Sequence, residues 1–120
     1  MSLPDADVLL LHNTRCSKSR ATKALLEQAG HVFQERDYQT QPLNLEELKD
    51  LQQRLGLPVS QWIRRGEAAF AEAQLQADSS DAELLAAMVS HPILLERPIV
   101  IRGQAARVGR PPEAVLELFD

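Results

Sequence analysis

The chain has 120 residues, a length typical of one domain and sufficient for a single hydrophobic core without disulfides or structural metal. The formal net charge of −4 argues against nucleic acid as the main partner. No apolar run approaches the roughly 20 residues of a membrane helix. Because the acidic N-terminus lacks a signal-peptide pattern and one cysteine cannot form an internal disulfide, we expect a cytoplasmic protein.

The first elements are expected to be a strand and a helix. Residues 1–6 look like a loose leader, and Val8–Leu11 is a continuous apolar run, typical of a strand buried on both faces. After a polar turn, residues 17–28 predict a helix that Ser17 caps and Gly30 ends.

The apolar stripe of this helix is predicted to consist of Ala21, Leu25, Leu26 and Ala29.

A second strand follows this helix. Alternating character over Val32–Tyr38 predicts the second strand. Strand, helix and strand in this order indicate a parallel βαβ unit with a right-handed crossover.

The middle of the chain, residues about 40–90, predicts helices only. Two of them carry a capping box, in which a glutamate follows the polar cap by three residues. They are Leu45–Leu55, capped by Asn44 with Glu47 and ended by Gly56, and Asp81–Val89, capped by Ser80 with Glu83 and ended by His91-Pro92. Short helical segments are expected at Pro58–Arg65 and Ala68–Gln76.

The last third predicts two strands and a helix. Ile99–Ile101 and Ala105–Val108 indicate a hairpin around Gly103, and Pro111-Pro112 opens a helix at Glu113–Phe119. The predicted architecture is therefore α/β, with a βαβ half and a ββα half. This is the thioredoxin-like plan, in a single domain of residues 1–120 with a helical insertion at about 40–90.

Cys16 stands in the polar turn before the first predicted helix. Free backbone N–H groups at a helix N-terminus and nearby cations lower the pKa of a thiol, and they also bind phosphate-like anions. The neighbouring polar groups are the hydroxyls of Ser17 and Ser19 and the side chains of His12, Arg15, Lys18 and Arg20. A lone cysteine is more often an inert small hydrophobic residue, but these polar neighbours favour a nucleophile that acts on an oxyanion.

Other cysteine and metal motifs are excluded. A zinc site needs more than one cysteine with clustered histidines, whereas the three histidines, at positions 12, 31 and 91, are scattered. A Cys-x5-Arg phosphatase loop needs arginine at position 22, which is Thr22, and Ser19 stands where a dithiol oxidoreductase has its second cysteine. An external thiol must therefore regenerate Cys16 if it is oxidised or modified.

Four segments, in order along the chain, carry a recognisable pattern. They are His12-Asn13-x-x-Cys16-x-x-Ser19-Arg20, Trp62-Ile63-Arg64-Arg65, the stretch from His91-Pro92 to Arg97-Pro98-Ile99-Val100, and Arg107-Val108-Gly109-Arg110-Pro111. Together they resemble the glutaredoxin-coupled arsenate reductase family, the ArsC-like proteins. The resemblance spans nearly the whole chain and implies a thioredoxin-like fold with a helical insertion.

The resemblance also implies roles for individual residues. Cys16 would be the nucleophile that forms a thiol–arsenate adduct, and His12 and Ser19 would support its thiolate. Arg64, Arg97 and Arg110 would hold the oxyanion, and Asn13, Ser17, Arg20 and Pro98, the last in a cis peptide, would support the site. Taken singly, each arginine is typical of a surface charge, and His12 is equally consistent with a strand-end histidine satisfied by backbone.

The implied activity is reduction of arsenate to arsenite, with glutathione and glutaredoxin as reductants. It requires no bound cofactor and no metal, and involves neither nucleic acid nor membrane. Two alternatives stay open: another glutathione-dependent thiol oxidoreductase such as a deglutathionylase, and a non-enzymatic module like the Spx-type regulators that bind RNA polymerase. Ser19 and the three arginines favour an oxyanion enzyme, because those regulators typically carry a Cys-x-x-Cys switch.

Overall fold

A computed structural model describes residues 8–13 and 15–119, which form two compact units. One unit is the continuous segment Pro42–Glu96, and the other combines residues 8–41 with residues 97–119. The predicted leader, residues 1–6, lies outside the described residues. The expectation that the whole chain is a single domain stays a prediction.

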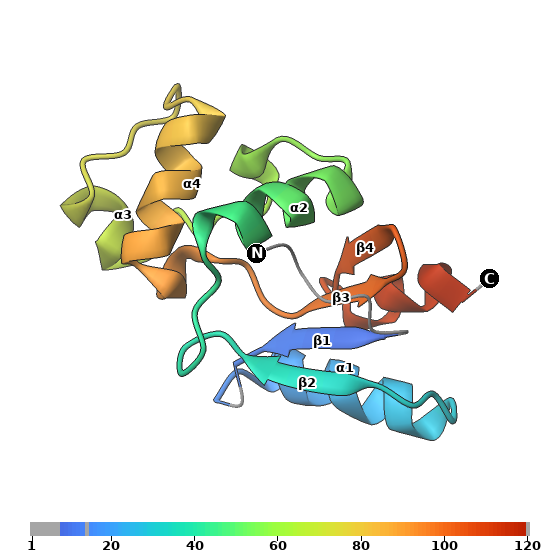
Figure 1. Ribbon diagram of the computed structural model, residues 1–120. Coiled ribbons are helices and arrows are strands. Elements are labelled where there is room, and N and C mark those ends of the chain that lie inside the picture. Colours follow the sequence, from blue (N-terminus) through green and yellow to red (C-terminus); the bar gives the residue numbers. More distant parts are fainter. Residues whose placement is uncertain (1–7, 14, 120) are drawn as a thin grey trace. The chain divides into compact units, whose positions relative to one another are not determined.

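The unit formed from both ends of the chain contains a four-stranded sheet in the order β2-β1-β3-β4 (Figure 1). The strands are β1 (Leu9–His12), β2 (Gln34–Asp37), β3 (Ile99–Arg102) and β4 (Ala105–Val108). β1 pairs in parallel with β2 and antiparallel with β3, which pairs antiparallel with β4. The predicted βαβ and ββα halves of the thioredoxin-like plan are confirmed.

The two strands of the βαβ half differ in burial. All four residues of β1 are buried, as its continuous apolar sequence predicts. The polar strand β2 lies at the edge of the sheet and is shorter than predicted, and Val32 stands before it with 90% of its surface exposed. Pairing with β1 begins at Gln34, which lies opposite Leu9, so the alternation before Gln34 does not continue the strand.

Helix α1 spans Ser17–Gln28 as predicted, but its N-cap is Cys16. The backbone carbonyl of Cys16 already accepts the N–H of Arg20 at 3.1 Å, so the hydrogen-bond ladder of the helix begins there. The prediction that Ser17 caps the helix is therefore wrong. Gly30, with φ of +78°, follows the last helical turn as predicted.

The predicted apolar stripe of α1 is right for Leu26 and wrong for its two alanines. The buried residues are Ser19, Thr22 and Leu26, whereas Ala21 and Ala29 are exposed. The three buried residues are spaced by three and four positions, so they share one face of the helix. Two of them are small and polar, which a search for apolar residues does not detect.

One face of the sheet is covered by α1 and by the C-terminal segment (Figure 1). Their shared core consists of Val8, Leu10, Leu26, Val100 and Val115. The last helix, Pro112–Phe119, is a 3-10 helix. Its Phe119 stacks on the His31 ring at 3.7 Å, and the Arg102 guanidinium lies 4.8 Å from the same phenyl ring.

The other unit is helical. It contains α2 (Leu45–Leu55), α3 (Ala68–Glu72) and α4 (Asp81–Ser90), with 3-10 turns at Val59–Gln61 and Pro92–Leu94. Both predicted capping boxes are confirmed, while the two helical segments between them are shorter than predicted. Trp62 is fully buried in this unit and donates its indole N–H to the Leu57 carbonyl at 3.3 Å.

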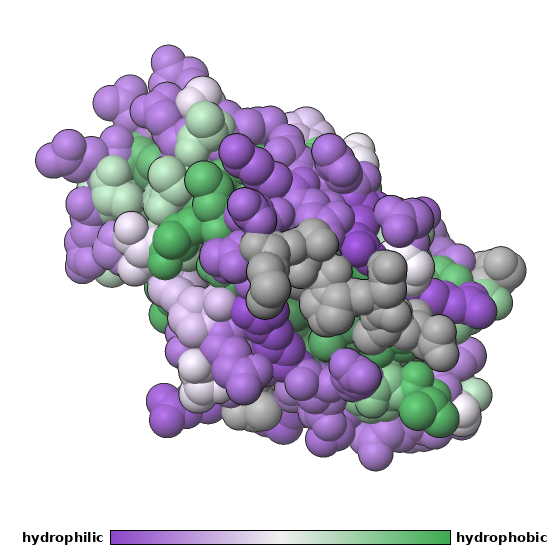
Figure 2. Space-filling model, viewed as in Figure 1, coloured by the Kyte–Doolittle hydropathy of each residue, from purple (hydrophilic) through white to green (hydrophobic). Residues whose placement is uncertain are grey.

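The surface shown in Figure 2 is mostly hydrophilic. Apolar surface on this face gathers over α4 and over the turn that joins α1 to β2. Among the described residues, no helix has the length and apolar character needed to cross a membrane.

The capping box of α2 makes a prediction about stability. The Asn44 side chain accepts the Glu47 N–H at 2.8 Å, and the Glu47 carboxylate accepts the Asn44 N–H at 3.1 Å. We expect Asn44→Ala to lower the free energy of unfolding by about 1 kcal/mol, because the Glu47 N–H at the helix end loses its partner. Urea unfolding measures this, with exposed Gln53→Ala on the same helix as the control. Equal losses in both variants contradict the role of the cap.

Candidate active site

The pairing of the strands brings four segments of the chain to one end of the sheet. β1 and β2 run in parallel and end together, with His12 opposite Asp37. β3 runs the other way and begins there, with Ile99 opposite Leu11. β4 ends there too, with Val108 opposite Ile99. The turn after β1, Tyr38 after β2, the residues just before β3 and the residues just after β4 therefore lie at the same end of the sheet.

The turn that carries Cys16 is held by its own backbone. The Cys16 N–H donates to the Asn13 carbonyl at 2.9 Å, and the Arg15 N–H donates to the Asn13 side-chain oxygen at 3.0 Å. The Asn13 N–H donates to the hydroxyl oxygen of Ser19 at 3.2 Å. Because Ser19 is fully buried on α1, this contact fixes the turn to the helix.

The Cys16 thiol is half-buried, and its environment favours the thiolate. Burial by itself raises the pKa of the thiol, but the backbone N–H groups of Ser19 and Lys18 and the side chain of Arg97 together lower the pKa of Cys16 to about 7. The hydroxyls of Ser17 and Ser19 were expected to serve the thiolate. The Ser19 hydroxyl accepts from the Asn13 N–H and Ser17 is exposed, and the role of both hydroxyls toward the thiolate stays a prediction.

Arg110 approaches Cys16 from the end of β4. Its Nη2 lies 3.9 Å from the sulfur, and its Nε donates to the Arg97 carbonyl at 2.9 Å. The Gly109 N–H donates to the Pro98 carbonyl at 2.8 Å. The Arg97–Pro98 peptide is cis, as the family resemblance implies, and the Arg110–Pro111 peptide is also cis.

Arg97 is linked to both Cys16 and Tyr38. Burial opposes the charge of its guanidinium, but side-chain hydrogen bonds with Tyr38 and with Cys16 outweigh burial and raise the pKa of Arg97. Tyr38 is 1% exposed and is the first residue after β2. Tyr38 was not among the predicted site residues, although its position at the end of a predicted strand was an available signal.

His12 is buried beside a carboxylate. Its Nε2 lies 3.2 Å from an oxygen of Glu35, and the Lys23 ammonium lies 3.1 Å from the same oxygen. Burial lowers the pKa of His12 more than Glu35 and Asp37 raise it, so the imidazole is neutral at pH 7. The lowered pKa of Cys16 is caused by Ser19, Lys18 and Arg97. The partner of His12 is therefore the Glu35 side chain, which the sequence did not indicate.

Two predicted residues remain, Arg20 on α1 and Arg64 in the helical unit. Arg20 is exposed on the first turns of α1. Arg64 belongs to the helical unit, where its Nε lies 3.1 Å from Glu67 and its Nη1 lies 3.0 Å from Glu96. That Arg64 joins Arg97 and Arg110 around an oxyanion stays a prediction.

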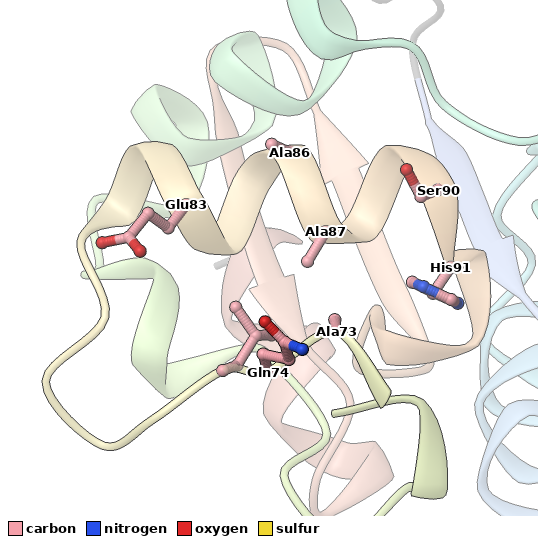
Figure 3. A pocket seen from close by; sticks show the side chains of 8 residues that line it. Ala73, Gln74, Glu83, Ala86, Ala87, Ser90 and His91 are labelled. Carbon is pink, nitrogen blue, oxygen red and sulfur yellow. The ribbon is translucent and has the colours of Figure 1, made fainter. Parts of the chain in front are cut away.

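The helical unit contains an open pocket of about 440 Å³ beside α4 (Figure 3). It is lined by Ala73, Gln74, Leu75, Glu83, Ala86, Ala87, Ser90 and His91. None of the predicted site residues lines it. Elsewhere in the described part of the chain, no group of three or more His, Cys, Asp or Glu side chains is arranged to hold a metal ion.

The fold and the site define a thioredoxin-like domain with a low-pKa cysteine at a helix N-terminus and two arginines beside it. Residues 11–118 match the ArsC family, and the chain belongs to this family.

Similar proteins agree with this assignment. An arsenate reductase of Haemophilus influenzae is 42% identical over 114 residues, which cover 93% of this chain and 98% of the relative. YfgD of Escherichia coli, whose name assigns no activity, is 44% identical over 92% of this chain and 95% of its own length. The structure of an arsenate reductase from Vibrio cholerae is similar with a TM-score of 0.87 at 47% identity, covering 98% of this chain and 97% of that one.

The origin of the lowered thiol pKa can be tested by alkylation. We expect the rate of Cys16 alkylation to rise with pH around a midpoint of about 7. Arg97→Ala should raise this midpoint by about one pH unit, because the thiolate loses an adjacent cation. Lys18→Ala is the matched control: it keeps the backbone N–H and should leave the midpoint in place. A native midpoint near that of a free thiol contradicts the described environment.

The protonation state of His12 can be followed by NMR. We expect its imidazole to titrate below the ordinary value of 6.5, because burial disfavours the charged form. Glu35→Gln should lower the midpoint further, since the carboxylate stabilises the imidazolium, whereas Glu27→Gln on the exposed side of α1 should not change it. A midpoint that rises in Glu35→Gln is incompatible with this pairing.

Proposed function

We propose that this protein reduces arsenate to arsenite, with Cys16 as the nucleophile and with glutathione and glutaredoxin as the reductants. The observation that carries the proposal is the cysteine of lowered pKa with Arg97 hydrogen-bonded to it and Arg110 Nη2 at 3.9 Å from its sulfur. Membership of the ArsC family and the arsenate reductases among the relatives support it.

The charges of the site fit a tetrahedral oxyanion. An arsenate dianion and a thiolate repel each other, so their encounter needs positive charge close to both. Arg97 and Arg110 supply it, and a guanidinium presents a planar fork of donors that matches the oxygens of such an anion. The N-terminus of α1 adds backbone N–H groups of the kind that bind phosphate. Arg64 is the third arginine of the proposed anion site, as the family resemblance implies.

In the first chemical step the Cys16 thiolate attacks arsenic(V). An S–As bond forms, one oxygen of arsenate takes up a proton and leaves as water or hydroxide, and arsenic remains in the +5 state. A thiolate available near pH 7 favours this step, because the thiol itself is a poor nucleophile. Arg110 and Arg97 stabilise the negative charge on the arsenate oxygens as the bond forms.

Glutathione completes the reduction. Its thiolate attacks the Cys16 sulfur or the arsenic adduct, and the two sulfurs together give up two electrons to arsenic, which leaves as arsenite. The product on the protein is a mixed disulfide between Cys16 and glutathione. A thiolate of glutaredoxin then attacks the glutathione sulfur and releases Cys16 as a thiolate. The cycle needs external thiols because Cys16 is the only cysteine in the sequence.

The cycle requires a reducing compartment, in agreement with the expected cytoplasmic location. The second candidate function is a glutathione-dependent thiol oxidoreductase, favoured by the single cysteine with a pKa of about 7. The two arginines beside the sulfur favour the oxyanion substrate over this alternative. An Spx-type switch is disfavoured, because Ser19 takes the place of its second cysteine.

The activity is tested by arsenate reduction with glutathione and glutaredoxin. We expect turnover by the native protein, none by Cys16→Ser, and an increase of KM of about tenfold or more in Arg110→Ala, because one charged donor pair to the anion is lost. Arg65→Ala, at an exposed position, changes the net charge by the same amount as Arg110→Ala and is the control for nonspecific charge effects.

Two results would redirect the assignment. Full activity of Cys16→Ser removes the nucleophile from the mechanism. Absence of arsenate turnover in a native protein that nevertheless releases glutathione from a glutathionylated peptide favours the second candidate function.

A further inference from the structure

Gly109 occupies a position where a side chain has no room. It is buried, directly after β4 and directly before Arg110. A Cβ atom at this position would lie 2.7 Å from Cγ of Pro98 and 2.8 Å from the hydroxyl oxygen of Thr22. Both distances are well below van der Waals contact. The φ of Gly109 is not in the left-handed region, so the requirement for glycine comes from the lack of space for a side chain.

Neither neighbour can move aside easily. Pro98 is a closed ring, and its carbonyl accepts the Gly109 N–H at 2.8 Å. Thr22 is fully buried on α1, and its hydroxyl has no hydrogen-bond partner among the described residues. A methyl group at position 109 would therefore displace the segment itself. Restoring an ordinary contact of 3.4 Å to Pro98 requires a shift of about 0.7 Å.

The segment that would shift is the one that carries Arg110. Two hydrogen bonds join residues 109 and 110 to residues 97 and 98: the Gly109 N–H to the Pro98 carbonyl, and the Arg110 Nε to the Arg97 carbonyl at 2.9 Å. With both in place, Arg110 Nη2 is 3.9 Å from the Cys16 sulfur. The close approach of the Gly109 backbone to Pro98 and Thr22 thus determines where the Arg110 guanidinium lies.

We propose that Gly109 is a positioning residue for anion binding: its missing side chain lets the Gly109-Arg110 segment seat against Pro98 and Thr22, which brings the Arg110 guanidinium to Cys16. The ligand class, a tetrahedral oxyanion, rests on the proposed function. The effect of Gly109 on Arg110 is independent of whether arsenate is reduced. Misplacing a positioned group by about 1 Å can lower activity by about two orders of magnitude.

The test uses inorganic sulfate as the probe and protection of Cys16 from alkylation as the readout. In Gly109→Ala we expect the sulfate concentration for half-protection to rise about tenfold or more. The midpoint of the alkylation pH profile should stay near 7, because the groups that lower the thiol pKa are Ser19, Lys18 and Arg97. A general loss of structure would change both quantities. Gly66→Ala, at a glycine with open space around it, is the control.

A double-mutant cycle separates positioning from an independent defect. Gly109→Ala, Arg110→Ala and the double variant are compared by sulfate protection. If Gly109 acts through Arg110, the double variant binds sulfate no more weakly than Arg110→Ala. If Gly109→Ala does not fold, the cycle is run with Thr22→Ala added to every member, which removes one of the two short contacts.

Three outcomes overturn the inference. They are unchanged sulfate protection in Gly109→Ala, additive losses in the double variant, and a thiol midpoint that rises to that of a free cysteine. If sulfate protects the native protein but the cycle shows no coupling between positions 109 and 110, this inference is overturned and the proposed function is not. Failure of sulfate to protect the native protein overturns the oxyanion site as well.

Discussion

The site depends on how α1 begins. In most helices a side-chain oxygen of the N-cap residue accepts an N–H of the first turn, which satisfies one of the unpaired donors. Here the N-cap is Cys16, whose side chain carries a sulfur in place of that oxygen. The N–H groups of Lys18 and Ser19 consequently act on the thiolate and lower its pKa. The polar turn, the buried Ser19 and the end of β1 all serve to place one sulfur at this helix end.

Charge is divided between backbone and side chains in this unit. Backbone dipoles and Arg97 favour the ionised sulfur, Arg110 Nη2 lies 3.9 Å from it, and His12 stays neutral with Glu35 as its partner. Because a neutral imidazole adds no cation, the positive charge near Cys16 comes from guanidinium groups, which keep their proton at any physiological pH. The positive charge beside Cys16 therefore persists over a pH range in which a histidine-based site would lose its charge.

Local signals in the sequence predicted most of the helices and strands. The features that were missed depend on contacts between residues far apart in the sequence. Asn44 with Glu47 and the hairpin at Gly103 were predicted because the chemistry lies within a few residues. Cys16, Arg97 and Arg110 were found through motif resemblance. Tyr38 and Glu35 were missed because their partners are far apart in sequence. The buried face of α1 was predicted wrongly, since small hydroxyl residues pack there.

The hydroxyl of Ser19 has a consequence for how such a scaffold changes its electron donor. A second cysteine at this position would create an internal dithiol, and the protein could then be recycled without glutathione. The same substitution would replace the oxygen that accepts the Asn13 N–H by a larger and weaker acceptor, at a fully buried position that fixes the turn to α1. In the proposed cycle, dependence on an outside thiol is thus linked to the residue that anchors the turn. A change of redox partner during evolution would need compensating substitutions around Asn13.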